Sequence, residues 1–247
     1  MDSKNSVDFK SLLIDARVVA QDFLKNSLKN QFYEEKNTTL NGQVFSTSYL
    51  DLQKFGQCVL EQLAAQGRIE PPYKIEVITF EFKNETLGLT EYPKEDGEKK
   101  FRISIEKSLN TCWTRLIVIK ELCQVYFDYE KKPPFFRINE MDKQISDLVS
   151  KHKCLIEKPD IFSLKVTDGN YSEFLAFYMA LYLVFPESQY STFNQLVEMA
   201  YDETLEPKLY DIAYIYRMPE YIVKLFHKKL APFYHHLVTE GSSFASL

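Results

Sequence analysis

The sequence predicts a mostly helical α+β protein in which a small sheet packs on a central helix. Its 247 residues are 45% hydrophobic, enough to bury a substantial core. Nineteen Phe and 16 Tyr stand against only 7 Gly, which favours a packed interior with few glycine-dependent turns. Three short β-like patterns lie between helical ones, so we expect one sheet flanked by helices.

Residues 1–72 are expected to form N-terminal helices. Apolar side chains recur at helical spacing between residues 7 and 28, with lysines and acids between them. A polar stretch from 34 to 43 interrupts this pattern. A second helix is expected to begin near Ser48, whose hydroxyl can cap a first turn, and to end before Pro71.

Residues 73–190 are expected to form the core. Segments 73–82, 87–92 and 101–105 are rich in β-branched and aromatic residues and predict strands of an antiparallel or mixed sheet. A helix from 110 to 129 follows. We also expect a short helix over 141–149 and a helix over 172–185, for which Ser172 is the candidate cap.

Residues 191–247 are expected to form C-terminal helices packed on the core. Helical patterns cover 193–201, 208–216 and 219–230, with Pro219 in a first turn. The last two could also be a helix-turn-helix with basic residues near its turn, which would suit a transcriptional regulator. We consider binding to nucleic acid unlikely, because acidic residues offset part of that charge.

Composition restricts the partners and the location. The net charge of -5 and pI near 5.5 give no general footprint for nucleic acid or anionic membranes. The N-terminus shows no secretory pattern, and we expect a cytoplasmic protein with reduced cysteines. The longest apolar run, Phe174 to Phe185, is too short to cross a bilayer and predicts a core helix.

The helix from 110 to 129 carries charges that need an explanation. Its residues are apolar on both faces, which is typical of a buried helix, yet it contains Lys120, Glu121 and Gln124. Buried charges must be paired or open onto a wet cleft, although a lysine and a glutamate at a helix edge can also extend into solvent. These three residues occupy the histidine, glutamate and histidine positions of the H-E-x-x-H zinc motif.

The segment from Arg102 to Pro186 resembles the ImmA/IrrE family of zinc metallopeptidases. The family's approach strand and histidine-bearing helix match Ile103-Ser104-Ile105, Leu109-Asn110, Arg115 and Lys120-Glu121-Leu122-Cys123-Gln124. Its second helix, whose glutamate is the third metal ligand, matches Glu173, Ala176, Ala180, Leu183, Val184 and Pro186, but departs from the family at Phe177 and Met179. The resemblance implies a zincin-like central helix with a degenerate metal site.

The resemblance and the substitutions together predict a catalytically inactive metallopeptidase-like protein. A protonated lysine cannot bind zinc and a glutamine oxygen binds it weakly, so no metal and no cofactor are expected. Such a pseudoenzyme would bind a protein or peptide through the former cleft or a sheet edge, and the family resemblance implies a role in bacterial or phage regulation. The alternatives are a hydrolase that uses Glu121 and Glu173, and the transcriptional regulator above. The oligomeric state is not predicted.

The sequence also makes a geometric prediction. Without a metal, the carboxylates of Glu121 and Glu173 would repel each other, and Lys120 is expected to point at one or both. Other metal-site candidates are weak: His152 with Cys154, and His235 with His236, have no second cluster at ligand spacing. Cys123 is expected to be a small packing residue and a weak nucleophile.

Overall fold

The fold is α+β, as predicted from the sequence. The computed structural model describes residues 6–26, 32–40, 42–82, 87–93, 99–128, 165–200 and 209–234. The helix expected over 141–149 lies outside these residues, as do the histidines at 152, 235 and 236 and the cysteine at 154. Among the described residues, no helix is both long enough and apolar enough to cross a membrane.

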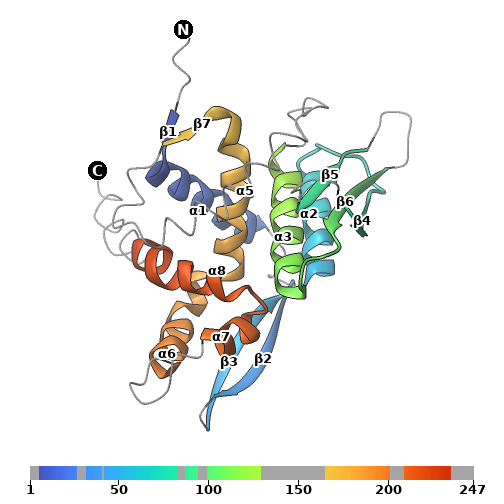
Figure 1. The fold of residues 1–247 in the computed structure, drawn as a ribbon. Coiled ribbons are helices and arrows are strands. Elements are labelled where there is room, and N and C mark those ends of the chain that lie inside the picture. The colour runs from blue at the N-terminus through green and yellow to red at the C-terminus, as the bar shows by residue number, and fades with distance from the viewer. Residues whose placement is uncertain are drawn as a thin grey trace.

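Helices form the centre of the molecule. α3 (Thr111–Asp128) and α5 (Asp168–Val184) lie side by side, with α1 (Phe9–Asn26) packed on α5 and α2 (Leu52–Ala65) packed on α3 (Figure 1). α3 begins where the sequence predicts, because the side chain of Asn110 accepts from the backbone N–H of Trp113 at 3.1 Å. α3 is therefore surrounded by protein, as its apolar faces require.

A three-stranded sheet covers the side of α3 away from α5 (Figure 1). It consists of β4 (Lys74–Phe80), β5 (Gly88–Glu91) and β6 (Lys100–Glu106), in the order β4-β6-β5. β4 runs parallel to the central strand and β5 antiparallel to it. All three strands were predicted, and the sheet is mixed.

One face of the sheet points at the helices. Phe101, Ile103 and Ile105 alternate along β6 and are 0% exposed. On β5, a Cβ atom at Gly88 would lie 2.4 Å from the Ile117 side chain of α3. A glycine is needed there, because any larger residue would push the strand away from the helix.

The prediction of helices alone over residues 1–72 was wrong. A β-hairpin, β2 (Tyr33–Leu40) and β3 (Gln43–Leu50), covers the polar stretch that interrupts the helical pattern and the expected start of the second helix. Ser48 lies inside β3, and α2 is capped instead by Asp51, whose carboxylate accepts from the N–H of Lys54 at 2.8 Å. The hairpin ends directly before the helix, which moves the cap three residues downstream.

The start of α5 also differs from the prediction. The strand β7 (Lys165–Thr167) pairs antiparallel with β1 (Ser6–Asp8) and leads directly into the helix at Asp168. Ser172 is therefore inside the helix and does not cap it. Glu173 lies beyond the first turn, so attraction to the helix N-terminus does not explain this acid.

The C-terminal helices follow the predicted order. After the short 3-10 turn η3 (Glu187–Gln189) come α6 (Tyr190–Ala200), α7 (Leu209–Tyr216), α8 (Glu220–Leu225) and the π-helical turn η4 (Phe226–Leu230). α6 starts three residues earlier than expected, because the 3-10 turn runs straight into it.

A tight turn joins α7 to α8. Arg217 has a positive φ of 53°, and Pro219 is the residue before the helix rather than a residue of its first turn. The apolar residues that α7 and α8 with η4 turn inward are buried, apart from the half-buried Tyr221: Ile212, Ala213, Tyr216, Ile222 and Phe226. The exposed face of α7 carries Tyr210 and Tyr214.

Candidate functional site

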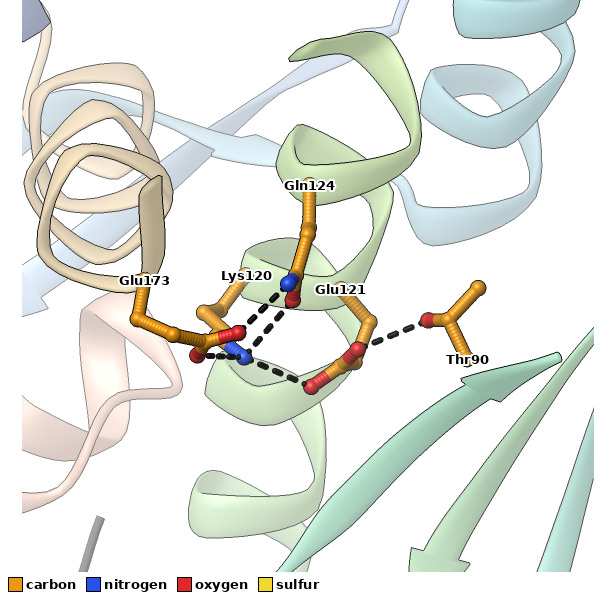
Figure 2. Close-up of polar contacts among 5 residues, drawn as sticks. All are labelled: Thr90, Lys120, Glu121, Gln124 and Glu173. Carbon is orange, nitrogen blue, oxygen red and sulfur yellow. Dashed lines mark hydrogen bonds and ion pairs between the residues drawn. The ribbon is translucent and has the colours of Figure 1, made fainter. Parts of the chain in front are cut away.

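The residues singled out in the sequence meet at the contact between α3 and α5 (Figure 2). The Lys120 ammonium lies 2.9 Å from the Glu121 carboxylate and forms an ion pair with Glu173, which approaches from α5. It also donates to the side-chain oxygen of Gln124 at 2.9 Å, one helical turn along α3. The prediction that Lys120 points at one or both carboxylates is confirmed, and it contacts both.

Each carboxylate has a second partner. The Gln124 side-chain nitrogen donates to Oε1 of Glu173, while Oε2 of that residue faces the lysine. Thr90, on β5, donates its hydroxyl to Oε2 of Glu121 at 2.7 Å, while Oε1 accepts from Lys120. The sheet and two helices thus supply one connected network, which Figure 2 shows.

The network uses the full donor capacity of the lysine. An ammonium has three N–H bonds, and three acceptors surround Nζ of Lys120: Glu121, Gln124 and Glu173. Three of the four carboxylate oxygens of the two glutamates accept a hydrogen bond, and the fourth, Oε2 of Glu173, is held only by its ion pair with Lys120. Polar networks stabilise an interior only when they are satisfied in this way.

The network is buried. Lys120 is 3% exposed, Glu121 is 0% and Glu173 is 8%. The alternative in which the lysine and the glutamate extend into solvent at a helix edge is therefore wrong. Removing such charges from water is costly, so their mutual contacts are what makes the burial tolerable.

Burial and charge shift the ionisation of two members. Burial alone would lower the pKa of Lys120, but the carboxylates of Glu121 and Glu173 outweigh it and raise that pKa. The pKa of Glu173 is raised mainly by burial and secondarily by Glu121, against the opposing effect of the lysine. Lys120 therefore stays positively charged, and Glu173 takes up a proton more easily than an exposed glutamate.

This arrangement leaves little scope for metal or acid-base chemistry. A lysine that stays protonated has no free electron pair for a metal. Glu121 is 0% exposed and each of its oxygens contacts Thr90 or Lys120, so a water molecule does not reach this carboxylate without a rearrangement. Within the described parts of the chain, no group of three or more His, Cys, Asp or Glu residues is placed to hold a metal ion.

Two contributors were missed from the sequence, Thr90 and Gly88. A glycine within a strand often marks a close approach of backbone to a neighbouring element, and Gly88 lies against Ile117 of α3. Alternation then places Thr90 on the same face of β5, where it reaches Glu121. The glycine in an otherwise β-like segment was the available signal.

Cys123 and Arg115, also noted in the sequence, lie close to the network along α3. Cys123 is 0% exposed and burial raises its pKa, so the prediction of a weak nucleophile is confirmed. Arg115 is buried and donates to the backbone carbonyl of Leu50 at the end of β3. It therefore connects α3 to the hairpin rather than to the network.

No protein-family model, curated protein or solved structure matches this chain. The resemblance to ImmA/IrrE peptidases therefore stays a prediction that rests on the motif residues. Function is therefore inferred from the geometry of the site.

Proposed function

We propose that this chain is a metallopeptidase-like protein that has no zinc peptidase activity and acts by binding a protein or peptide. The observation that carries the proposal is the position of the Lys120 ammonium between Glu121 and Glu173. In the ImmA/IrrE pattern these acids correspond to the general base and a metal ligand. A lysine between them supplies the positive charge that a metal would otherwise provide.

The same geometry speaks against the alternative of a hydrolase that uses Glu121 and Glu173. Hydrolysis would require one carboxylate to release its partners, contact water and reach a substrate. Both acids are buried, and both are held by Lys120. Removing either from the lysine would leave an unpaired charge in the interior.

The surface that supports peptide binding is the outer edge of β5, which pairs with no other strand among the described residues. The backbone carbonyl of Leu87 accepts from the N–H of Glu106 on β6. In an antiparallel pair every second residue directs its N–H and C=O to the partner strand, so the backbone groups of Leu89 and Glu91 also face β6. The N–H and C=O groups of Gly88 and Thr90 therefore point away from β6. Extended peptides bind such edges through main-chain hydrogen bonds.

Hydrogen exchange of the chain, measured with and without a selected peptide, tests this proposal. A display library of extended peptides would be screened against the whole chain, and backbone exchange measured with and without the best binder. We expect slower exchange at Gly88 and Thr90 and little change at the Leu89 and Glu91 amides, which already face β6. Protection confined to other elements, or no binder, would contradict the proposal.

A peptidase assay completes the test. We expect the chain not to cleave the selected peptide, with or without added zinc. The Glu121→Gln variant should behave in the same way. Cleavage by the unmodified chain that is abolished in Glu121→Gln would instead support the hydrolase.

A further inference from the structure

The second edge of the sheet, β4, has its own set of outward-facing backbone groups. Lys74 donates its N–H to Lys99 at 3.1 Å, and the carbonyl of Phe80 accepts from Lys107 at 2.9 Å. In a parallel pair, alternate residues direct both groups to the partner strand. Residues 74, 76, 78 and 80 therefore face β6, and residues 75, 77 and 79 face outward.

No described residue pairs with this outward edge. β4 is the terminal strand in the order β4-β6-β5, and no hydrogen bond joins the outward groups of Ile75, Val77 or Thr79 to the rest of the described chain. The strand also exposes apolar surface: Val77 is 48% exposed and Phe80 is 52% exposed. Natural edge strands often carry charges that discourage pairing; on β4 these are Lys74 and Glu76, whereas the three residues whose backbone groups point outward are uncharged.

We propose that β4 pairs antiparallel with β4 of a second copy of this chain, around a two-fold axis at Val77. Val77 then faces Val77 of the second copy, and Ile75 faces Thr79 in both directions. The residues brought together are those whose backbone groups point outward, so each pair exchanges two hydrogen bonds. The result is one continuous six-stranded sheet.

The sequence of β4 is compatible with antiparallel pairing to an identical strand. All three outward residues are β-branched, the type that packs best across strands. On the opposite face of the sheet, Lys74 lies opposite Phe80 and Glu76 opposite Ile78, so no two like charges are directly opposed. A two-fold contact requires this self-complementarity, whereas an unrelated partner does not.

The remaining charge near the axis is already neutralised. Glu76 lies 3.0 Å from the Arg102 guanidinium and 3.3 Å from the Lys100 ammonium, both on the neighbouring strand of the same chain. The Glu76 side chains of the two copies lie diagonally across the axis, and repulsion between them is reduced because each carboxylate is already paired with cations. These pairs lie across β4 and β6, so they remain in place when β4 pairs on its other side.

Dimerisation here is independent of the proposed peptide binding, because it uses the opposite edge of the sheet. A contact through one seven-residue strand buries less surface area than a standard stable interface. We therefore expect a monomer–dimer equilibrium that shifts to dimer as protein concentration rises. The whole chain is used in the test, since the sheet packs on α2 and α3.

Sedimentation of Val77→Lys is the first arm of the test. At the axis this change places two ammonium groups opposite each other, while the inward hydrogen bonds of β4 to β6 are untouched. The matched control is Val44→Lys on the hairpin, where the valine is 63% exposed. We expect dimer from the wild type and from Val44→Lys and only monomer from Val77→Lys.

Cross-linking of Val77→Cys is the second arm. Hydrogen-bonded antiparallel pairs have Cα atoms about 5.5 Å apart, a separation within the usual range for a disulfide. We expect oxidation to give a covalent dimer of Val77→Cys, and none above the wild-type background for Val44→Cys. A wild type that is monomeric at every concentration, a dimer that survives Val77→Lys, or no Val77→Cys cross-link would each overturn the proposal.

Discussion

Two cations are buried on the same helix, α3, and the charges of the groups that contact them differ. Lys120 lies between two carboxylates and an amide oxygen, and its pKa is raised. Arg115, about one and a half turns earlier, is 7% exposed and donates to the neutral carbonyl of Leu50. Among the described residues no ion pair joins a carboxylate to this arginine, although the charge of Asp51 favours its protonated form.

The pKa of the arginine shows the consequence. Burial first, and then the charge of Arg217, lower the pKa of Arg115 to about 10, while the charge of Asp51 opposes this shift. The Arg217 guanidinium lies 4.3 Å from the centre of the Tyr49 ring. Arg115 itself lies 5.8 Å from the same ring. Arg115 is thus a buried cation whose hydrogen-bond partner is neutral. Lys120, in contrast, forms a matched set with the two carboxylates that pair with it, Glu121 and Glu173. The cost of deleting each cation should separate the two cases.

The largest effect is expected for Lys120→Met. This change leaves the carboxylates of Glu121 and Glu173 buried without their cation, which should lower the free energy of unfolding by about 3 kcal/mol. Urea unfolding measures it. The matched control adds Glu121→Gln and Glu173→Gln to the same chain, which removes the stranded charges and should recover much of the loss. Equal stability of the single variant and the wild type would contradict a matched set.

Gly88→Ala tests whether β5 must lie close to this set. The added Cβ would lie 2.4 Å from Ile117, so the strand must shift away from α3 and Thr90 with it. We expect a loss of about 2 kcal/mol. Gly56→Ala in α2 is the control: its Cβ lies 3.3 Å from a flexible end of Ile75, and alanine favours a helix. Thermal unfolding should therefore separate the two variants, and equal melting temperatures would argue against a required close approach.

Arg115→Met should have the smaller effect of the two cation deletions. It leaves the carbonyl of Leu50 without this partner, which destabilises the fold, but it also removes a buried charge that the carboxylate of Asp51 offsets only in part. We expect the free energy of unfolding to change by about 1 kcal/mol or less. A loss as large as that of Lys120→Met would remove the contrast between the two sites.

The smallest expected effect is the pH dependence of stability, which reports on the titration of one residue, Glu173. The pKa of Glu173 is raised above 4.5 in the folded chain. Between pH 4.5 and that raised value the folded chain holds a proton that the unfolded chain has lost, so this residue favours folding more as pH falls toward 4.5. Its contribution is lost as pH rises through the folded-state pKa. The stability difference between wild type and Glu173→Gln should follow this trend; a difference that does not vary with pH would contradict it.

Local patterns were sufficient for the sheet and for α3. Alternating β-branched and aromatic residues identify β4 to β6, and apolar residues on both faces identify a buried helix. The hairpin was missed because its first strand exposes polar residues such as Glu35, Lys36 and Asn37 to solvent, which hides the alternation. The dipeptide Asn41-Gly42 between the two strands is a strong hairpin signal and would have identified it.

The site was predictable only in part. Spacing within one helix places Lys120 and Gln124 on the same face, so their contact follows from local geometry. Glu173 is 49 residues beyond Gln124, and only the family resemblance connected them. Thr90 joins through the packing of β5 on α3, which no local pattern specifies. Charge balance was the most useful physical guide, because buried carboxylates require a cation.

Zinc content tests the central claim most directly, namely that the Lys120 ammonium provides the positive charge at this site. Elemental analysis would be made on protein purified without chelator, after equilibration with zinc and removal of the free metal. The wild type should hold far less than one zinc per chain, whereas Lys120→His combined with Gln124→His should gain zinc if Glu173 completes the ligand set. One tightly held zinc per wild-type chain, lost in Glu173→Gln, would contradict the account.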